Sequence, residues 1–229
     1  MPYTIGCYHA HHSNIDYIHN ALEPYDAELV HFVDPGLDRR KADPGWTPEQ
    51  SAEKVASMLH WIGSSRVDAI LITCTFFTAH IPQQYSFPVP VIKIDDPLFA
   101  AMGESAQPPL LVFTNPATVQ GTAERWQAYA RQRGIDRPLK TELLEGTFEL
   151  FMRGDKDAYL KAVSEGLARL AERHRESRVW AAQLSMAAAA RQAAERSGAV
   201  IGEPLGALTE AMARELPLRP RPRGGMVDA

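Results

Sequence analysis

The sequence contains few cysteines and no long apolar segment. Of its 229 residues only Cys7 and Cys74 are cysteines, too few to build a disulfide framework. No apolar run approaches the roughly 18 to 20 residues that span a bilayer. The amino-terminal segment MPYTIGCYHAHHSN also lacks the basic-then-apolar pattern of a signal peptide. These absences predict a cytoplasmic protein whose two free thiols each have a packing or a chemical role.

A strong excess of charge of one sign is also missing. The formal net charge is −4, and 45% of the residues are hydrophobic. A chain with this charge balance has no general attraction for nucleic acid or for an anionic membrane. Its length and apolar content are enough to bury a sizeable core. We therefore expect a globular protein with neither a nucleic-acid nor a membrane partner.

Several common catalytic and binding motifs do not occur. The sequence has no GxGxxG after its first apolar run, no GxxxxGK[ST], no GxSxG, and neither HExxH nor CxxC. These absences argue against an ordinary dinucleotide fold, a nucleotide-phosphate loop, a hydrolase nucleophile elbow and the common zinc motifs. Any catalytic residues of this protein therefore lie outside these common motifs.

Short apolar runs rich in β-branched residues alternate with helical patterns, which is typical of βα units on a parallel sheet. In the first half, this pattern predicts strands over residues 3–8, 27–33, 67–73 and 89–94, and a helix over 48–65 that ends at Gly63. In the second half, it predicts strands over 110–114, 140–146, 178–184 and 198–203, and a helix over 155–176. Aromatic residues within predicted elements are expected in the core; they are Trp61, Trp126, Trp180, Phe148 and Phe151.

The two halves resemble each other. DDPLFAAM, which begins at Asp95, is similar to GEPLGALTEAM, which begins at Gly202, and equivalent strand ends carry Cys74 and Ser185 at a similar offset. This repetition predicts an internal duplication. The expected fold is α/β, with two pseudo-symmetric, doubly wound parallel-sheet lobes.

We place the boundaries of these lobes from composition. The segment GESAQPP breaks the pattern with Gly, Ser and Pro. It divides a first lobe at 1–103 from a second lobe at 109–215, with closing helices that can cross to the other lobe. The tail at 217–229 has almost nothing to bury, so we expect it to be disordered.

Polar residues follow the predicted strands at their carboxyl ends, where open parallel sheets bind ligands. The clearest candidate for a catalytic residue is Cys74, which lies between the end of an apolar strand and the polar residue Thr75. If a helix begins there, its aligned amides would stabilise a thiolate. The alternative is a packing role, the usual one for a free cysteine. The other clusters are His9 to Asn14, Thr114–Asn115 with Thr118, and Ser185.

Three segments together resemble a known superfamily. LITCTFFTAH, around Cys74, resembles the cysteine-threonine strand end of the aspartate/glutamate/hydantoin racemases. LLVFTNPATVQGT is similar to the threonine-rich loop that opens their second lobe, and VWAAQLSMA to their second catalytic strand end. With these motifs in order and in mirrored halves, the similarity covers most of residues 1–215.

The resemblance implies a cofactor-independent enzyme with its active site in the cleft between two lobes. One thiol removes a proton from a carbon next to a carboxylate, and a second thiol returns a proton from the opposite face. By this resemblance, hydroxyl and amide donors hold the substrate carboxylate. The matching residues here are Thr75, Thr114, Asn115 and Thr118, although threonine also often serves as a helix cap. A homodimer would be ordinary for this superfamily.

The sequence departs from the family pattern because Ser185 stands where we expect the second cysteine. A serine hydroxyl is too weak an acid to exchange protons as a thiol does. Three interpretations remain. A histidine among His9, His11 and His12 supplies the second proton in a racemase or isomerase; the enzyme needs one thiol, as in a related decarboxylase or lyase; or the chain only binds its ligand.

The histidine-rich segment HAHH offers a different interpretation. His9, His11, His12 and His31 have the side chains of a transition-metal site, but no zinc motif accompanies them. Histidines one and two residues apart on a loop rarely converge on one ion. We therefore predict no metal. Either His9 and His11 contact the substrate, or the segment is a solvated loop.

Overall fold

The computed structural model describes residues 2–40, 43–81 and 86–221. The chain divides into two compact units. Unit 1 comprises the residues up to Ile94 together with those from Thr209 onward, and unit 2 comprises Asp95–Leu208. The predicted α/β class with two parallel sheets is confirmed, one sheet lying in each unit.

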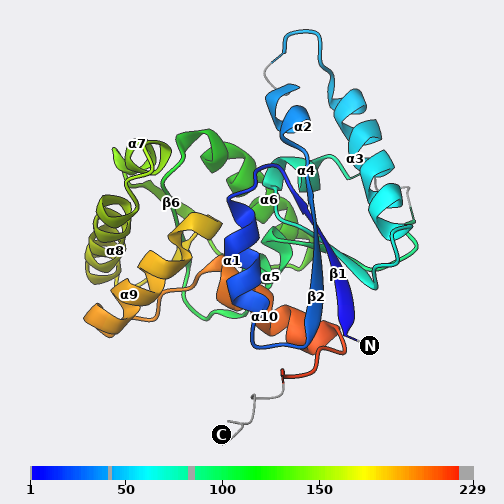
Figure 1. The fold of residues 1–229 in the computed structure, drawn as a ribbon. Coiled ribbons are helices and arrows are strands. Elements are labelled where there is room, and N and C mark those ends of the chain that lie inside the picture. The colour runs from blue at the N-terminus through cyan, green and yellow to red at the C-terminus, as the bar shows by residue number, and fades with distance from the viewer. Residues whose placement is uncertain (1, 41–42, 82–85, 222–229) are drawn as a thin grey trace, which may run out of the picture. The chain divides into compact units, whose positions relative to one another are not determined.

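Unit 1 is built on a four-stranded parallel sheet (Figure 1). Its strands are β1 (Tyr3–His9), β2 (Ala27–Val33), β3 (Ala69–Ile72) and β4 (Val91–Lys93), in the order β2-β1-β3-β4. The connecting helices are α1 (Asn14–Leu22), α2 (Pro35–Arg40), α3 (Pro48–Gly63) and α4 (Thr75–Ala79). The chain leaves β1 and β3, which are neighbours, towards opposite edges of the sheet. The carboxyl ends of these two strands therefore form the switch point where open parallel sheets bind ligands.

Helix α3 covers one face of this sheet. Residues spaced along one side of the helix are buried with alternate residues of the strands, in a cluster that includes Val55, Leu59, Ile62, Tyr8, Ile70 and Ile72. A capping box starts the helix, because the Thr47 side chain accepts from the Gln50 amide and the Gln50 side chain accepts from the Thr47 amide. The expectation that Trp61 lies in the core is wrong, since its exposed fraction is 63%. The buried stripe passes through Leu59 and Ile62, and Trp61 projects from the other side of the helix.

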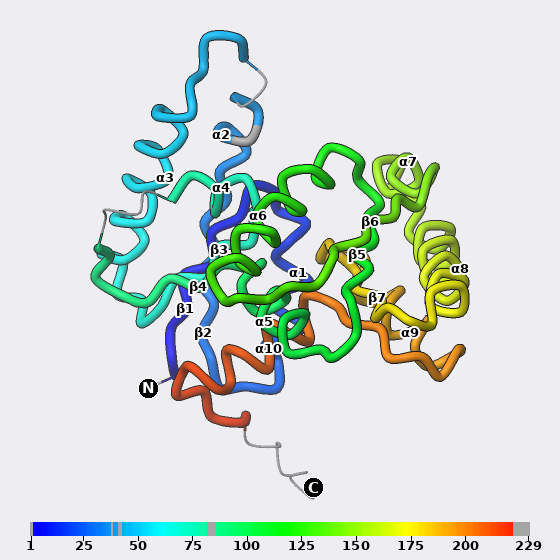
Figure 2. The backbone as a smooth tube through the Cα atoms, turned by 180° about the vertical axis from the view of Figure 1, so that it is seen from behind, coloured from blue at the N-terminus to red at the C-terminus, as the bar shows by residue number. Residues whose placement is uncertain are grey.

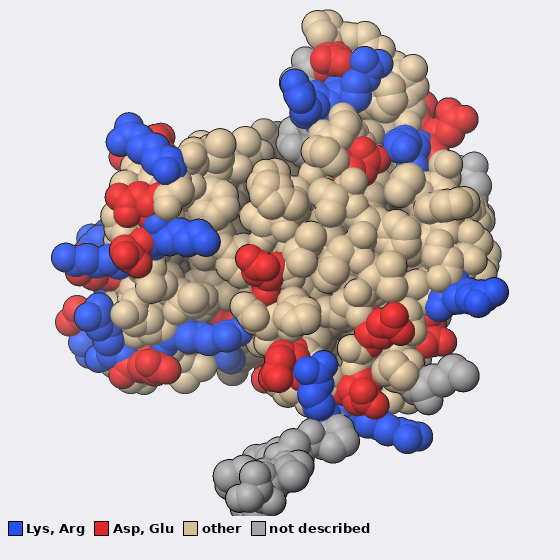
Figure 3. Space-filling model, in the orientation of Figure 1, with Lys and Arg blue, Asp and Glu red and all other residues tan. Residues whose placement is uncertain are grey.

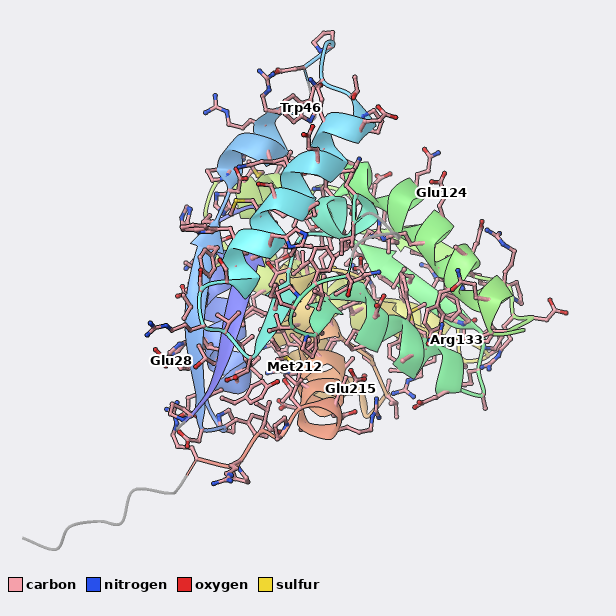
Figure 4. The ribbon with its side chains drawn as sticks, turned by 90° about the vertical axis from the view of Figure 1, so that its right-hand side faces the viewer. Glu28, Trp46, Glu124, Arg133, Met212 and Glu215 are labelled. Carbon is pink, nitrogen blue, oxygen red and sulfur yellow. The ribbon has the colours of Figure 1, made fainter. Side chains whose placement is uncertain are left out.

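The loop that leads into α3 is held by an aromatic residue. Trp46, labelled in Figure 4, lies between α2 and α3 and donates its indole N–H to Ser51 Oγ at 2.8 Å. The guanidinium of Arg40 stacks over the same ring at 4.6 Å. These contacts tie the end of α2 to the start of α3.

Unit 2 carries a three-stranded parallel sheet, whose strands are labelled in Figure 2 and coloured from green to yellow. Its strands are β5 (Pro109–Phe113), β6 (Lys140–Leu143) and β7 (Arg178–Ala181), in the order β6-β5-β7. Its helices are α5 (Asp95–Glu104), α6 (Val119–Gln132), α7 (Thr147–Met152), α8 (Lys156–Arg173) and α9 (Ala187–Ser197), with 3₁₀ turns at Pro116–Thr118 and Leu184–Met186. Leu110 and Val112 pack in one cluster with α8 and α9, and Leu111 and Phe113 pack in another with α5 and α6. Both faces of this sheet are thus covered, as expected for a doubly wound fold.

The fourth strand predicted for the second half, over residues 198–203, does not form. Only one isolated parallel bridge joins Gly202 to Trp180 there. A Cβ atom on Gly202 would lie 1.9 Å from the Trp180 ring. The chain therefore passes too close to the tryptophan for a side chain at this position. The single bridge occupies the place that β4 has in the first sheet.

The unit boundary differs from the one predicted at residues 103–109. Helix α5 belongs to unit 2, and most of α10 (Pro204–Glu215) belongs to unit 1. For α5 the cause is packing, because Leu98, Phe99 and Met102 are buried in one cluster with Trp126 of α6. The composition of the sequence predicted a boundary in the loop that follows α5. The buried contacts of α5 instead assign this helix to unit 2.

The expectation of a disordered tail is wrong for residues 217–221, and residues 222–229 lie outside the described part of the chain. The amide of Asp26 donates to the Arg219 carbonyl at 2.7 Å, and the amide of Arg221 donates to the Pro24 carbonyl at 2.8 Å. An antiparallel bridge joins Tyr25 to Pro220 between these bonds. Backbone pairing of this kind needs no apolar side chain, which is why composition did not reveal it.

Charged residues of both signs are mixed over the face of the molecule seen in Figure 3, in keeping with the small net charge. Among the helices formed by residues 2–40, 43–81 and 86–221, none is long and apolar enough to cross a membrane.

Candidate active site

Cys74 lies at the switch point of the first sheet. It is two residues beyond the end of β3 and is the N-cap residue of α4, with an extended backbone (φ −110°, ψ 120°). Its carbonyl accepts from the Thr78 amide at 3.0 Å, which closes the first turn of the helix. The side chain is half-buried, and Thr75 is the first residue of the helix. The first amides of a helix have no partner within it, and Cys74 is the residue that precedes these amides.

The two cysteines have opposite environments. Cys7 is fully buried on β1, and burial raises the pKa of its thiol to about 12. Cys74 is half-buried at a strand end. A substrate can therefore meet the Cys74 thiol but not the Cys7 thiol.

Histidine 9 is completely buried at the end of β1. One of its ring nitrogens, Nδ1, is 2.8 Å from Thr73 Oγ1, and the other, Nε2, is 2.9 Å from His31 Nδ1. Thr73 Oγ1 also accepts from the Asn14 side-chain amide at 3.2 Å. Burial, with the neighbouring His31, lowers the pKa of His9 to about 4, so this imidazole is neutral at neutral pH. Two residues of the predicted His9 to Asn14 cluster, His9 and Asn14, thus contact Thr73, the residue that precedes Cys74.

His11 and His12 have a different setting from His9. Both are exposed, and their rings lie 4.2 Å apart. His11 Nδ1 is also 2.8 Å from Ser13 Oγ. The HAHH segment therefore divides into one buried and two exposed imidazoles.

In unit 2, three donors converge on the side-chain oxygen of Gln183. Oε1 of Gln183 accepts from the Thr114 amide at 2.8 Å, from the Thr114 hydroxyl at 2.8 Å and from the Asn115 amide at 3.0 Å. The predicted donors Thr114 and Asn115 thus lie together at the end of β5 and already bind an oxygen. Gln183 is not among the predicted site residues, although it stands in the segment VWAAQLSMA, which resembles a catalytic strand end.

Ser185 belongs to the same network. Its Oγ is 2.9 Å from the Tyr159 hydroxyl, which in turn lies 3.3 Å from Thr114 Oγ1. Burial raises the pKa of Tyr159, although its hydrogen bonds to Ser185 and Thr114 act in the other direction. The phenol therefore stays protonated at neutral pH.

Thr118 and Asn115 also make local structural bonds. The Thr118 hydroxyl donates to the Asn115 carbonyl at 2.9 Å, and the Asn115 side chain accepts from the Ala117 amide at 3.0 Å. These bonds are the helix-cap and turn roles that both residue types often have.

The register of the two sheets identifies the true counterpart of Cys74. The Thr73 amide donates to the Tyr8 carbonyl across the first sheet, and the Ala182 amide donates to the Val112 carbonyl across the second. Thr73 and Ala182 are therefore equivalent, and the next residues are Cys74 and Gln183. Both are extended N-cap residues two positions beyond their strand. The expectation that Ser185 occupies this position is wrong, because it lies two residues further on, inside the 3₁₀ turn.

Comparison with known proteins agrees with this architecture. No protein-family model and no curated protein sequence matches the chain. Solved structures do match: the aspartate racemase of Picrophilus torridus has a TM-score of 0.67 at 12% identity, covering 96% of both chains. The allantoin racemase of Pseudomonas fluorescens has a TM-score of 0.61 at 16% identity, covering 92% of this chain and 91% of the other. The glutamate racemase of Francisella tularensis, solved with D-glutamate, has a TM-score of 0.62 at 14% identity and covers 93% and 80%.

The chain has the fold of these racemases. At such identities the likeness concerns the fold alone, and function must be argued from the site. Within this racemase fold, one switch point presents a half-buried thiol and the other presents a carboxamide held by three donors.

Proposed function

We propose that this chain is a cofactor-independent enzyme of the racemase type, in which Cys74 exchanges a proton with a carbon next to a carboxylate. The observation that carries the proposal is the half-buried thiol at the start of α4, at the switch point of a racemase-like sheet. A thiolate there takes the proton from carbon, and water or an exposed imidazole of His11 or His12 returns a proton to the opposite face. The other cysteine, Cys7, is fully buried.

The donors around Gln183 support a carboxylate ligand. The two amides and the hydroxyl of Thr114 and Asn115 converge on one neutral amide oxygen. Bonds from the same donors to a charged carboxylate are shorter and stronger. We therefore expect a carboxylate to displace the Gln183 oxygen. In unit 1, Thr75 is the residue that follows Cys74 and remains a candidate donor.

A second candidate is a single-thiol lyase, and Gln183 favours it. A carboxamide neither gives nor accepts protons as a thiol does, so the counterpart of Cys74 cannot act as the second base. In a decarboxylation the bond to the leaving carboxylate breaks, carbon dioxide departs, and its electron pair remains on an enediolate. The Cys74 thiol then protonates that carbon, and water restores the proton to sulfur. One thiol is enough for this reaction.

Solvent exchange tests both candidates. The protein is incubated in heavy water with amino acids, hydantoins, maleate and substituted malonates, and deuterium on carbon and released carbon dioxide are measured. Exchange without carbon dioxide would support the racemase-type reaction, and deuterium incorporation with carbon dioxide would support the lyase. We expect Cys74→Ala to lower the rate by about 10²- to 10⁴-fold, the usual loss when an acid-base group is removed.

Two further variants give this experiment its controls. Cys74→Ser keeps the shape of the side chain but replaces the thiol by a much weaker acid, so it too should lose the exchange. Trp61→Ala changes an exposed side chain on α3 and should retain it. Exchange that survives in Cys74→Ala would contradict the proposal. So would a silent panel combined with a Cys74 thiol that reacts no faster than a packed one.

A further inference from the structure

Three potential metal ligands meet on neighbouring strands of unit 1. Cys7 and His9 are two residues apart on β1 and therefore lie on the same face of the sheet. His31 is the register partner of Cys7 on β2, so it lies on that face as well. The ligand atoms of these three side chains all lie within 4.8 Å of one another.

We propose that Cys7, His9 and His31 bind a zinc ion. One thiolate and two imidazoles form a ligand set that zinc uses, with a water molecule in the fourth position. Zinc binds nitrogen at about 2.0–2.1 Å and sulfur at about 2.3 Å, so tetrahedral neighbours lie about 3.3–3.7 Å apart. The facing nitrogens of His9 and His31 are now 2.9 Å apart. A separation of a few tenths of an ångström would admit the ion between them.

The surroundings of His9 orient its ring for this role. When Nε2 binds the ion, Nδ1 carries the proton and donates it to Thr73 Oγ1, which is 2.8 Å away. Thr73 Oγ1 is itself held by the Asn14 side chain at 3.2 Å and lies 3.4 Å from the Tyr8 carbonyl. A histidine ligand whose second nitrogen is fixed in this way is the usual arrangement in metal sites.

Binding requires the Cys7 thiol to lose its proton. Burial opposes this loss by raising the pKa of the thiol to about 12, so the thiolate forms only together with the bound ion. The Cys7 thiol is 3.8 Å from the Ile5 carbonyl of its own strand, a weak interaction. On binding, the S–H bond breaks, the proton passes to solvent and a sulfur–zinc bond forms.

This site is separate from the proposed carbon-acid chemistry. Its ligands are Cys7, His9 and His31, whereas the proposed base is Cys74. The ion would fix β1 to β2 and hold His9 against Thr73, the residue before Cys74. The zinc proposal can therefore fail while the proposed function stands, and the reverse also holds.

Cobalt(II) is the probe for a test, because a thiolate ligand gives it a charge-transfer absorption band. The full chain is stripped with a chelator, titrated with cobalt(II) and then with zinc. We expect one cobalt ion per chain, a thiolate band, and loss of the band when zinc displaces cobalt. Cys7→Ala should abolish the band, and Cys74→Ala should keep it. His31→Asn, at a half-buried position, should weaken cobalt binding at least about tenfold, because one of three protein ligands is lost.

Two controls separate this site from others. The double variant His11→Ala/His12→Ala removes the exposed imidazoles of the same segment and should leave the band unchanged. Far-ultraviolet circular dichroism of each variant reports whether it folds. The proposal is overturned if no thiolate band appears, if Cys74→Ala removes the band, or if folded His31→Asn binds cobalt as tightly as the unchanged chain.

Discussion

Gln183 and Cys74 show how one side chain sets the chemistry of a strand end. Both are extended residues that begin a helical turn two positions beyond a buried strand. One carries a thiol that can exchange a proton. The other carries a carboxamide that is held by Thr114 and Asn115. The two switch points thus share a backbone and differ in what they can do to a substrate.

Gly202→Ala should lower the free energy of unfolding by about 1 to 3 kcal/mol, the usual range for an overpacked core. The added methyl group would lie 1.9 Å from the Trp180 ring, which is itself 2% exposed. Gly45→Ala is the control, because a Cβ there meets nothing within 4 Å. Urea unfolding of both variants measures the difference. Equal stability would mean that the chain at Gly202 can move away from the ring.

At the scale of single elements, α3 depends on local and distant contacts together. Its capping box is formed by two residues close in sequence, Thr47 and Gln50. The apolar side of the helix is buried because it packs against the sheet. The cap fixes where the helix begins, and the sheet decides which side of the helix is covered. This division explains why the start of α3 was predicted correctly and the exposure of Trp61 was not.

Thr47→Ala should lower the free energy of unfolding by about 0.5–2 kcal/mol, the range for loss of a helix cap. The variant removes the bond from the Gln50 amide at 3.3 Å and leaves the reciprocal bond from the Thr47 amide to Gln50 Oε1 at 2.9 Å. Thermal unfolding of Thr47→Ala and Thr47→Ser measures the effect. The serine variant keeps an acceptor and should unfold close to the unchanged chain. If it is as unstable as the alanine variant, the hydroxyl is not what stabilises the helix.

At the scale of the whole molecule, the two sheets repeat one topology with one strand missing. β2-β1-β3 in unit 1 corresponds to β6-β5-β7 in unit 2, and the bridge at Gly202 takes the place of β4. In unit 1 the carboxy-terminal segment adds a pairing of its own, between residues 24–27 and 219–221. Residues distant in sequence thus contribute to the stability of the first unit.

A chain that ends at Leu218 should be less stable than one that ends at Arg221 by about 1–3 kcal/mol. The shorter chain loses two backbone hydrogen bonds, from Asp26 to Arg219 and from Arg221 to Pro24, each contributing about 0.5–1.5 kcal/mol. Urea unfolding of the two truncated chains measures the difference. Identical midpoints and slopes would show that this pairing contributes nothing to folding.

The sequence by itself determined the fold class, the alternation of strands and helices, and the importance of the strand ends. Strands and helices follow from the period of apolar residues, which is a local property. All four strands of unit 1 and three strands of unit 2 were predicted in this way, as was the grouping of Thr114 and Asn115 after β5. Cys74 was likewise placed at the end of β3.

Only the tertiary structure decided which residues are equivalent and which come together. Inter-strand hydrogen bonds made Gln183, rather than Ser185, the counterpart of Cys74. The pairing of β1 with β2 brought His31 to Cys7 and His9, and the segment predicted as a fourth strand of unit 2 pairs only through the bridge at Gly202. These outcomes depend on register and on contacts between residues far apart in the chain, and the period of a single segment contains neither.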